Sequence, residues 1–385
     1  MMMHRFLFVL PVLSAALLAQ KIEFKTPPTQ DQPLRYSLQT KLKTTETSKT
    51  LINGAEPEGG AAGGRGGEMS LAQEIVFDEG PSSAPWRDYK KVAATQTRPG
   101  RDGAPQETKT EGGLQGKKVT LKAGDGGKVT FTEGEGDKQT DVAAALVRGV
   151  PGRISFLGFL PDHGVATGEE FDVAKSFLPA LRNLAHAVNR APTEDAGGAA
   201  GGGQGGRGQG GRGQGGRGQG DRPNVVLQLL SGGKFDVEAK GKVTGVDNDI
   251  ATLAIKAKLT GKGTNEEMGI MGGMGGGFGG AGGRGQGGGA AGGGAPGGGA
   301  AGGGAAAPAG TSKVDASFDL TGTVRFDLKA QRIVGIEFAG DVQVARESSR
   351  KGQNRDGEEQ KIDTTSQSKG NVELKASCET VPAAK

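Results

Sequence analysis

One histidine of the sequence lies among several carboxylates. His163 directly follows Asp162, and three acidic residues come soon after it, at Glu169, Glu170 and Asp172. Imidazole nitrogens and carboxylate oxygens both bind metal ions, so a metal site is one interpretation of this stretch. The spacing does not form a His-Glu-x-x-His motif, which places two histidines on one face of a helix. We therefore expect a solvated turn here, and we predict no metal ligand and no cofactor.

The single cysteine, Cys378, is the second residue that could do chemistry. A nucleophilic cysteine needs a basic partner that lowers the pKa of its thiol, and no such partner can be placed beside it. Cys378 lies in the alternating stretch "NVELKASCETV", which is typical of a strand and predicts a buried or half-buried thiol. The chain also lacks a Gly-x-Ser-x-Gly motif. We predict no catalytic residue and a protein that is not an enzyme.

A third group of candidate residues is the run of arginines in "QGGRGQGGRGQGGRGQGDR", residues 204–222. Regularly spaced arginines can neutralise phosphates, so nucleic-acid binding is one hypothesis. The repeats contain no aromatic side chain on which a base could stack. The whole chain is also nearly balanced in charge, with 47 basic and 43 acidic residues. We favour a solvated spacer and rank nucleic-acid binding last.

The amino terminus has the composition of a secretory signal peptide. Arg5 is followed by an apolar run at 6–18, which is too short for a stable membrane-spanning helix. Small residues follow this run, and we predict cleavage after Ala19, with Ala16 as the alternative. This predicts export to the periplasm or the medium of a bacterium, with no transmembrane anchor left after cleavage. With one cysteine, the exported chain must fold without an internal disulfide.

Most of the remaining chain alternates between apolar and polar residues. The alternation is longest in 313–348, where "DLKAQR" interrupts it as a plausible hairpin turn. A period of two predicts strands with one apolar face, so we expect long antiparallel strands. Segments with the same strand-like composition are 34–47, 71–80, 86–97, 117–134, 224–232, 235–263 and 360–377.

One segment has a helical period instead. Residues 169–192 carry Val173, Phe177 and Leu181 at helical spacing, which predicts one apolar stripe along a helix. Pro179 lies inside this segment, so we expect a kink there or two short helices.

Glycine supplies 74 of the 385 residues, and much of it lies in two tracts at 197–222 and 271–312. Such tracts lack the apolar surface that stabilises a fold, so we predict disordered insertions. The strands on both sides of 271–312 could pair directly as a hairpin. The polar stretch 95–118 also has the composition of a loop.

These elements predict a mainly β protein, with a curved sheet or half-barrel and one helix at about 170–190. The expected parts are a signal peptide (1–19), a β-rich first part with the helix (20–196), an insertion (197–222), a β-hairpin (223–270), a second insertion (271–312) and closing hairpins (313–385). Two separate domains joined by the tracts are the alternative architecture.

The strand patterns of 223–270 and 311–378, such as "GTVRFDLKAQRIVGIEFAGDVQV", are similar to those of uncharacterised exported bacterial β-rich proteins. That resemblance implies export and a β-rich body, but no activity. Our first hypothesis is a non-enzymatic binding or structural role in the cell envelope, with an unidentified partner. The alternative comes from the expected layout, which resembles half-barrel carriers of lipids and lipoproteins. In that case an apolar ligand would contact Val173, Phe177 and Leu181.

Overall fold

The structure, a computed structural model, describes residues 21–25, 31–56, 67–100, 103–123, 129–134, 139–142, 152, 154–189, 225–268, 311–353 and 358–381. The predicted signal peptide with its cleavage residue Ala19, the insertion at 197–222 and residues 269–310 lie outside the described residues. Across the described ranges, no helix combines the length and the apolar character that crossing a membrane would require.

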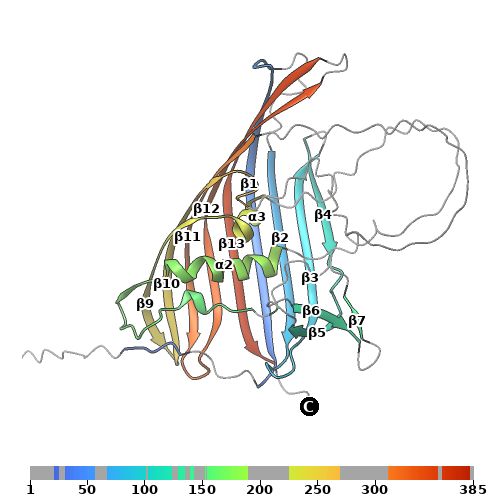
Figure 1. Ribbon diagram of the computed structural model, residues 1–385. Coiled ribbons are helices and arrows are strands. Elements are labelled where there is room, and N and C mark those ends of the chain that lie inside the picture. The colour runs from blue at the N-terminus through green and yellow to red at the C-terminus, as the bar shows by residue number, and fades with distance from the viewer. Residues whose placement is uncertain are drawn as a thin grey trace, which may run out of the picture.

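The described residues form one antiparallel sheet of 13 strands that does not close (Figure 1). The strand order is β7-β6-β5-β3-β2-β1-β13-β12-β11-β10-β9-β8, and β4 pairs with β3 outside this path. This confirms the predicted mainly β class with long antiparallel strands. The strands are β1 Leu34–Ile52, β2 Gly67–Glu79, β3 Trp86–Pro99, β4 Pro105–Glu111, β5 Lys118–Ala123, β6 Val129–Glu133, β7 Thr140–Asp141, β8 Glu170–Asp172, β9 Asp236–Asp247, β10 Ile250–Gly263, β11 Thr311–Asp327, β12 Arg332–Gln353 and β13 Glu359–Thr380.

The first and last long strands lie side by side in the middle of the sheet. β1 pairs with β13 along its whole length, from Leu34 opposite Thr380 to Ile52 opposite Ile362. The sheet is therefore continuous between the two parts of the chain that the sequence analysis expected at 20–196 and 313–385.

The hairpin of β10 and β11 spans the second glycine-rich tract. Ile250 lies opposite Asp327 at one end of the pair, and Gly263 lies opposite Val314 at the other. The prediction that the flanks of this tract pair directly is confirmed. The turn between β11 and β12, at "DLKAQR", is confirmed as well.

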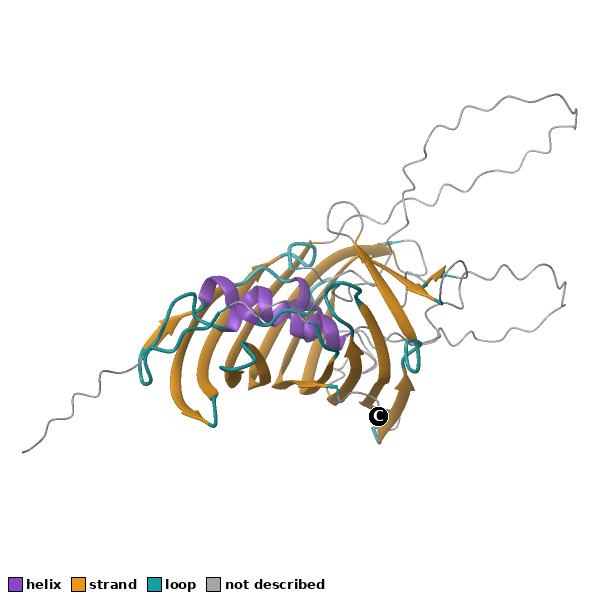
Figure 2. Cartoon of the chain, turned by 90° about the horizontal axis from the view of Figure 1, so that it is seen from below, coloured by secondary structure: helices purple, strands orange, loops and turns teal. Residues whose placement is uncertain are grey.

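Two α-helices cover one face of the sheet, which we call the inner face (Figures 1 and 2). Helix α2, Ala174–Asn189, confirms the predicted helix and continues through Pro179, so it is not divided into two. A 3-10 turn, η3, Leu157–Phe159, precedes it.

Helix α3, Val225–Gly232, corrects two predictions. The strand expected at 224–232 is wrong, and the hairpin expected over 223–270 begins only at Asp236. The described residues thus contain two α-helices, whereas the sequence analysis expected one. A short apolar run has no clear period, so a buried helical turn and a buried strand look alike in the sequence.

The stretch 95–118 is a further correction. It was expected to be a loop, but it contains the end of β3 and all of β4, and Pro99 pairs with Pro105 across the turn. β4 reads "PQETKTE", and nearly all of its side chains are exposed. Backbone pairing at the side of the sheet therefore forms this strand without an apolar face, and alternation cannot reveal such a strand.

The sheet curves around the helices (Figure 2), and three glycines on the inner face allow this curvature. Gly322 lies on β11, Gly340 on β12 and Gly370 on β13. Each glycine is two residues away from the position directly opposite the glycine of the neighbouring strand, so the three form a diagonal glycine line across the sheet. A Cβ at these positions would lie 2.1, 1.9 and 1.9 Å from a backbone oxygen of the neighbouring strand. Side chains are excluded along this line because the backbones approach so closely.

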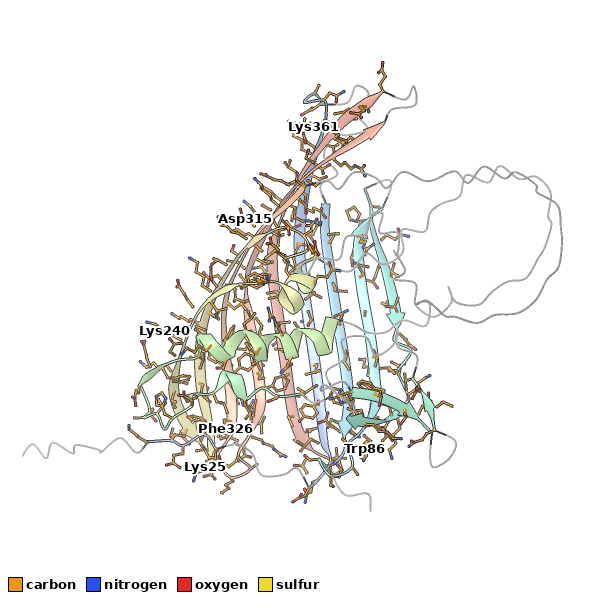
Figure 3. The ribbon with its side chains drawn as sticks, viewed as in Figure 1. Lys25, Trp86, Lys240, Asp315, Phe326 and Lys361 are labelled. Carbon is orange, nitrogen blue, oxygen red and sulfur yellow. The ribbon has the colours of Figure 1, made fainter. Side chains whose placement is uncertain are left out.

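The core lies between the inner face and the segments that cover it. Alternate residues of each long strand are buried, because every second side chain points to the inner face. At the lower end of the sheet, the ring of Phe24 meets that of Phe326 at 5.2 Å, and the backbone N–H of Lys25 donates to Gln331 Oε1 at 3.0 Å. Figure 3 shows Lys25 and Phe326 at this end, so the residues before β1 also cover the inner face.

Candidate functional site

The candidate site is the contact between the inner face and helix α2. One row of directly opposed inner-face residues crosses the sheet beneath the helix. From β8 to β2 the row consists of Phe171, Gly241, Ile255, Gly322, Phe338, Leu374, Thr40 and Gln73. The row is apolar as far as β13 and becomes polar on β1 and β2.

The three residues of the predicted stripe face this row. Val173, Phe177 and Leu181 are 3%, 0% and 0% exposed. The Phe177 ring lies 5.5 Å from that of Phe338 on β12, and both rings contact Phe159, at 5.4 and 5.1 Å. The stripe thus lies at the contact between helix and sheet, and its contact with a ligand stays a prediction.

The side chains of α2 form their hydrogen bonds with the covering segments. Ser176 Oγ donates to the carbonyl of Gly158 at 2.7 Å, and Asn183 Nδ2 donates to that of Ser155 at 3.1 Å. Arg182 donates to the carbonyl of Gly233, just after α3. These bonds join α2, η3 and the end of α3 into one layer. Packing between this layer and the sheet is largely apolar, and apolar contacts are not directional.

A buried ion pair joins strands β2 and β3. Arg87 Nε donates to Glu79 Oε2 at 2.7 Å, and the two side chains are 1% and 7% exposed. The guanidinium also donates to the carbonyl of Gly152 at 3.1 Å and lies 5.1 Å above the Phe77 ring. Burial lowers the pKa of Arg87, but the charges and hydrogen bonds of Glu79 and Tyr89 together outweigh it and raise the pKa overall, so Arg87 stays charged.

The thiol of Cys378 is buried beside Tyr36 on the inner face, as the strand pattern predicted. Burial raises the pKa of Cys378 to about 11 and also raises the pKa of Tyr36. A thiol with so high a pKa is protonated at neutral pH and is a poor nucleophile.

His163 and the carboxylates near it in the sequence are exposed, unlike the residues of this site. His163 is exposed, and its Nδ1 lies 2.7 Å from Asp162 Oδ1. Glu169 accepts a hydrogen bond from the backbone of Ala166, and Asp172 accepts one from Ala174 at the start of α2. These two carboxylates therefore stabilise a turn and a helix end. In the part of the chain that the structure describes, no three His, Cys, Asp or Glu residues are grouped as metal ligands would be.

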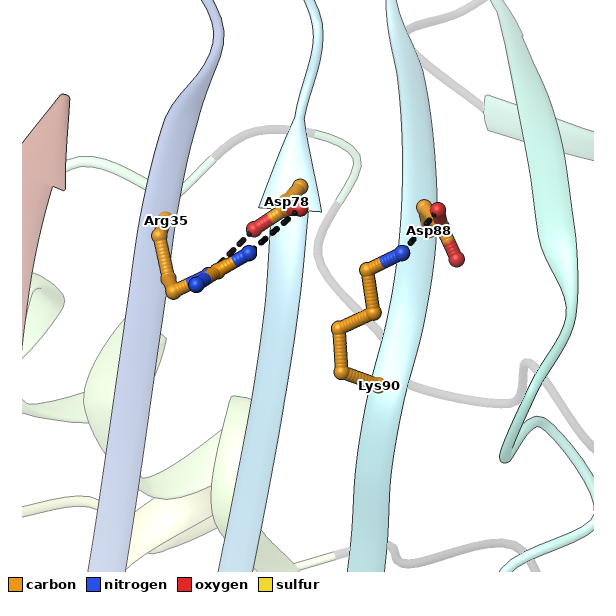
Figure 4. A network of polar contacts seen from close by, with 4 residues as sticks. All are labelled: Arg35, Asp78, Asp88 and Lys90. Carbon is orange, nitrogen blue, oxygen red and sulfur yellow. Dashed lines mark hydrogen bonds and ion pairs between the residues drawn. The ribbon is translucent and has the colours of Figure 1, made fainter. Parts of the chain in front are cut away.

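The outer face of the sheet carries exposed and paired charges. Figure 4 shows Arg35, which donates to both carboxylate oxygens of Asp78, at 2.7 and 3.0 Å, and Lys90, which donates to Asp88. A shallow depression of about 330 Å³ lies further along this face, where Lys262 and Asp315 form an ion pair at 3.4 Å. Its lining is mixed and polar, unlike the inner face.

Sequence reasoning missed the polar end of the inner face. Its buried members are Thr40 and Thr44 on β1, Gln73 on β2 and Ser368 on β13. A signal for two of them exists in the sequence: Thr40 has the same phase as Leu38 and Leu42, and Gln73 the same phase as Leu71 and Ile75. A polar residue in the inward phase of a strand points into the core. No protein-family model and no curated protein matches the sequence.

Proposed function

We propose that this chain is an exported, non-enzymatic binding protein of the bacterial cell envelope that takes up an apolar ligand between the sheet and helix α2. The observation that carries this proposal is a helical layer that is hydrogen-bonded within itself and packs on the apolar inner face of an open sheet. The start of α2 is tied to β9, because β8 pairs with β9 and the N–H of Val173 donates to the carbonyl of Ala239 at 3.1 Å. The rest of α2 can separate from the sheet by breaking few directional bonds.

The composition of the contact also favours an apolar ligand. The row beneath α2 presents side chains of Phe, Ile and Leu over several strands, and Phe177 and Leu181 oppose them. A hydrocarbon chain that enters here would gain about 25 cal/mol for each Å² of its own apolar surface that leaves water, and this gain must exceed the loss of the α2 contacts that it replaces. A purely structural role is the competing proposal, in which α2 stays permanently packed on the sheet.

Titration with a neutral fluorescent apolar probe, 1-N-phenylnaphthylamine, tests the proposal. We expect saturable binding near one probe per chain. Leu181→Trp adds a ring inside the contact and should weaken binding, whereas Lys175→Trp adds the same ring on the exposed side of α2 and should not. Absence of saturable binding, or equal losses in the two variants, would favour the structural role.

Export is tested separately. Expression of the full chain in a bacterium, followed by sequencing of the amino terminus, should find Gln20 as the first residue of the mature protein. Retention of residues 1–19 in the purified protein would contradict the proposed cleavage after Ala19.

A further inference from the structure

Among the described residues, four buried side-chain oxygen atoms have no hydrogen-bond partner, and two of them lie together on the inner face: Thr40 Oγ1 and Gln73 Oε1. The side chains belong to adjacent strands and stand directly opposite each other. Thr40 is 1% and Gln73 is 9% exposed, so bulk water does not replace the missing partners. An unmade hydrogen bond at a buried oxygen is destabilising, so a group that bonds to both oxygens would be stabilising here.

The surroundings of the pair are aliphatic. Leu38 and Leu42 flank Thr40 along β1, Leu71 and Ile75 flank Gln73 along β2, and Leu374 of β13 lies opposite Thr40 on its other side. An ionised group brought here would lose its hydration and gain no counter-charge from these neighbours. A neutral group would satisfy both oxygens at much lower cost.

The chemistry of the two oxygens defines the group further. The amide oxygen of Gln73 only accepts hydrogen bonds, whereas the hydroxyl of Thr40 both donates and accepts. A ligand hydroxyl could therefore donate to Gln73 and accept from Thr40. The pair lies at the end of the inner-face row where α2 packs over β1 and β2, and the row continues through Leu374 and Phe338 as an apolar path.

We infer that Thr40 and Gln73 bind a neutral hydroxyl group of a ligand whose hydrocarbon chain lies along the row beneath α2. The ligand class is a long-chain alcohol or a monoacylglycerol, in preference to an ionised fatty acid. This inference rests on the proposed function, and it adds the position and the polarity of the ligand's head group.

Competition against the bound fluorescent probe tests the inference with three ligands of equal chain length: monooleoylglycerol, methyl oleate and oleate. We expect the wild-type protein to prefer monooleoylglycerol over methyl oleate by about tenfold, the contribution of one or two hydrogen bonds. Oleate should bind more weakly than monooleoylglycerol at pH 8. In the variant Thr40→Val/Gln73→Leu the preference should disappear while the affinity for methyl oleate stays the same.

Thr44→Val is the matched control, because Thr44 is a buried inner-face threonine of the same strand and its hydroxyl is not one of the two orphaned oxygens. It should keep the preference. The double variant should also melt no lower than wild type, since it removes unpaired polar atoms.

The outcomes separate the two proposals. If none of the three ligands displaces the probe and the probe itself does not bind, the proposed function fails and this inference fails with it. If the ligands bind but the double variant keeps the wild-type preference, the function stands and the head-group site is wrong. Equal loss of all three ligands together with a lower melting temperature would assign the pair a structural role only, and it would also overturn the inference.

Discussion

Replacement of Gly370 by alanine should destabilise the protein, because the bend of the sheet leaves no room for a side chain there. The Cβ would lie 1.9 Å from the carbonyl oxygen of Lys43, 2.7 Å from the Cα of Thr44 and 2.8 Å from the carbonyl carbon of Lys43. All three are backbone atoms of β1 and cannot rotate away. To reach even 3.0 Å, the shortest spacing that real Cβ atoms adopt, the strands must separate by 1.1 Å (3.0 minus 1.9).

Overpacking of this kind costs about 1–3 kcal/mol. The reduced freedom of alanine in the unfolded chain offsets about 0.5–1 kcal/mol of that cost. We therefore expect Gly370→Ala to lower the free energy of unfolding by up to about 2.5 kcal/mol. Gly335→Ala is the control, because its Cβ would meet no atom closer than 3.6 Å. It should be neutral or stabilising by up to about 1 kcal/mol.

Urea unfolding followed by circular dichroism measures both free energies under the same conditions. The two variants should differ in sign, or by at least about 1 kcal/mol. If Gly370→Ala is as stable as Gly335→Ala, the close approach of β1 and β13 is not a constraint on the curvature, and the reasoning from the glycine line is refuted.

Three further predictions concern other parts of the chain. Glu79→Gln should lower the free energy of unfolding by about 3–5 kcal/mol, because it removes the charge that balances the buried Arg87. The double variant Arg87→Met/Glu79→Gln should lose less free energy of unfolding, and urea unfolding measures both. Cys378 should react slowly with iodoacetamide in the folded protein at pH 7.5 and faster as the pH rises toward its pKa of about 11, because only the thiolate reacts; rapid labelling at neutral pH without denaturant would contradict its burial. Deletion of 197–222 should leave the melting temperature nearly unchanged, and a large decrease in a thermal scan would disprove the spacer interpretation.

The sequence predicts the hairpins well because their information is local. The alternation in β9 to β12 and the turn at "DLKAQR" lie within a few residues of the contacts they specify. Even the pairing of β10 with β11 follows from two matching alternations on either side of the glycine tract. The helix α2 is equally local, since its stripe repeats every three or four residues.

The order of the strands depends on contacts between distant parts of the chain, and the sequence does not predict it. Nothing in the alternation of β1 indicates that it pairs with β13 rather than with a neighbour in the chain. For the same reason, the sequence does not predict which residues come together in the candidate site. The phase of Thr40 indicates that it points inward, but only the register places it opposite Gln73. β4 and α3 were mispredicted for a different reason, because one has no apolar face and the other has no period.

The hairpin of β10 and β11 has a consequence for how this protein can be altered. Residues 269–310 leave and rejoin the described chain close to two strands that hold each other through paired residues from Ile250 to Gly263. Beyond the last pair, Asn265 still donates its backbone N–H to Ser312 Oγ at 3.2 Å. A protease cut within 269–310 would therefore yield two fragments that stay associated. The same position should accept a foreign folded domain, because a longer connection costs only about 0.6 kcal/mol for each doubling of its length.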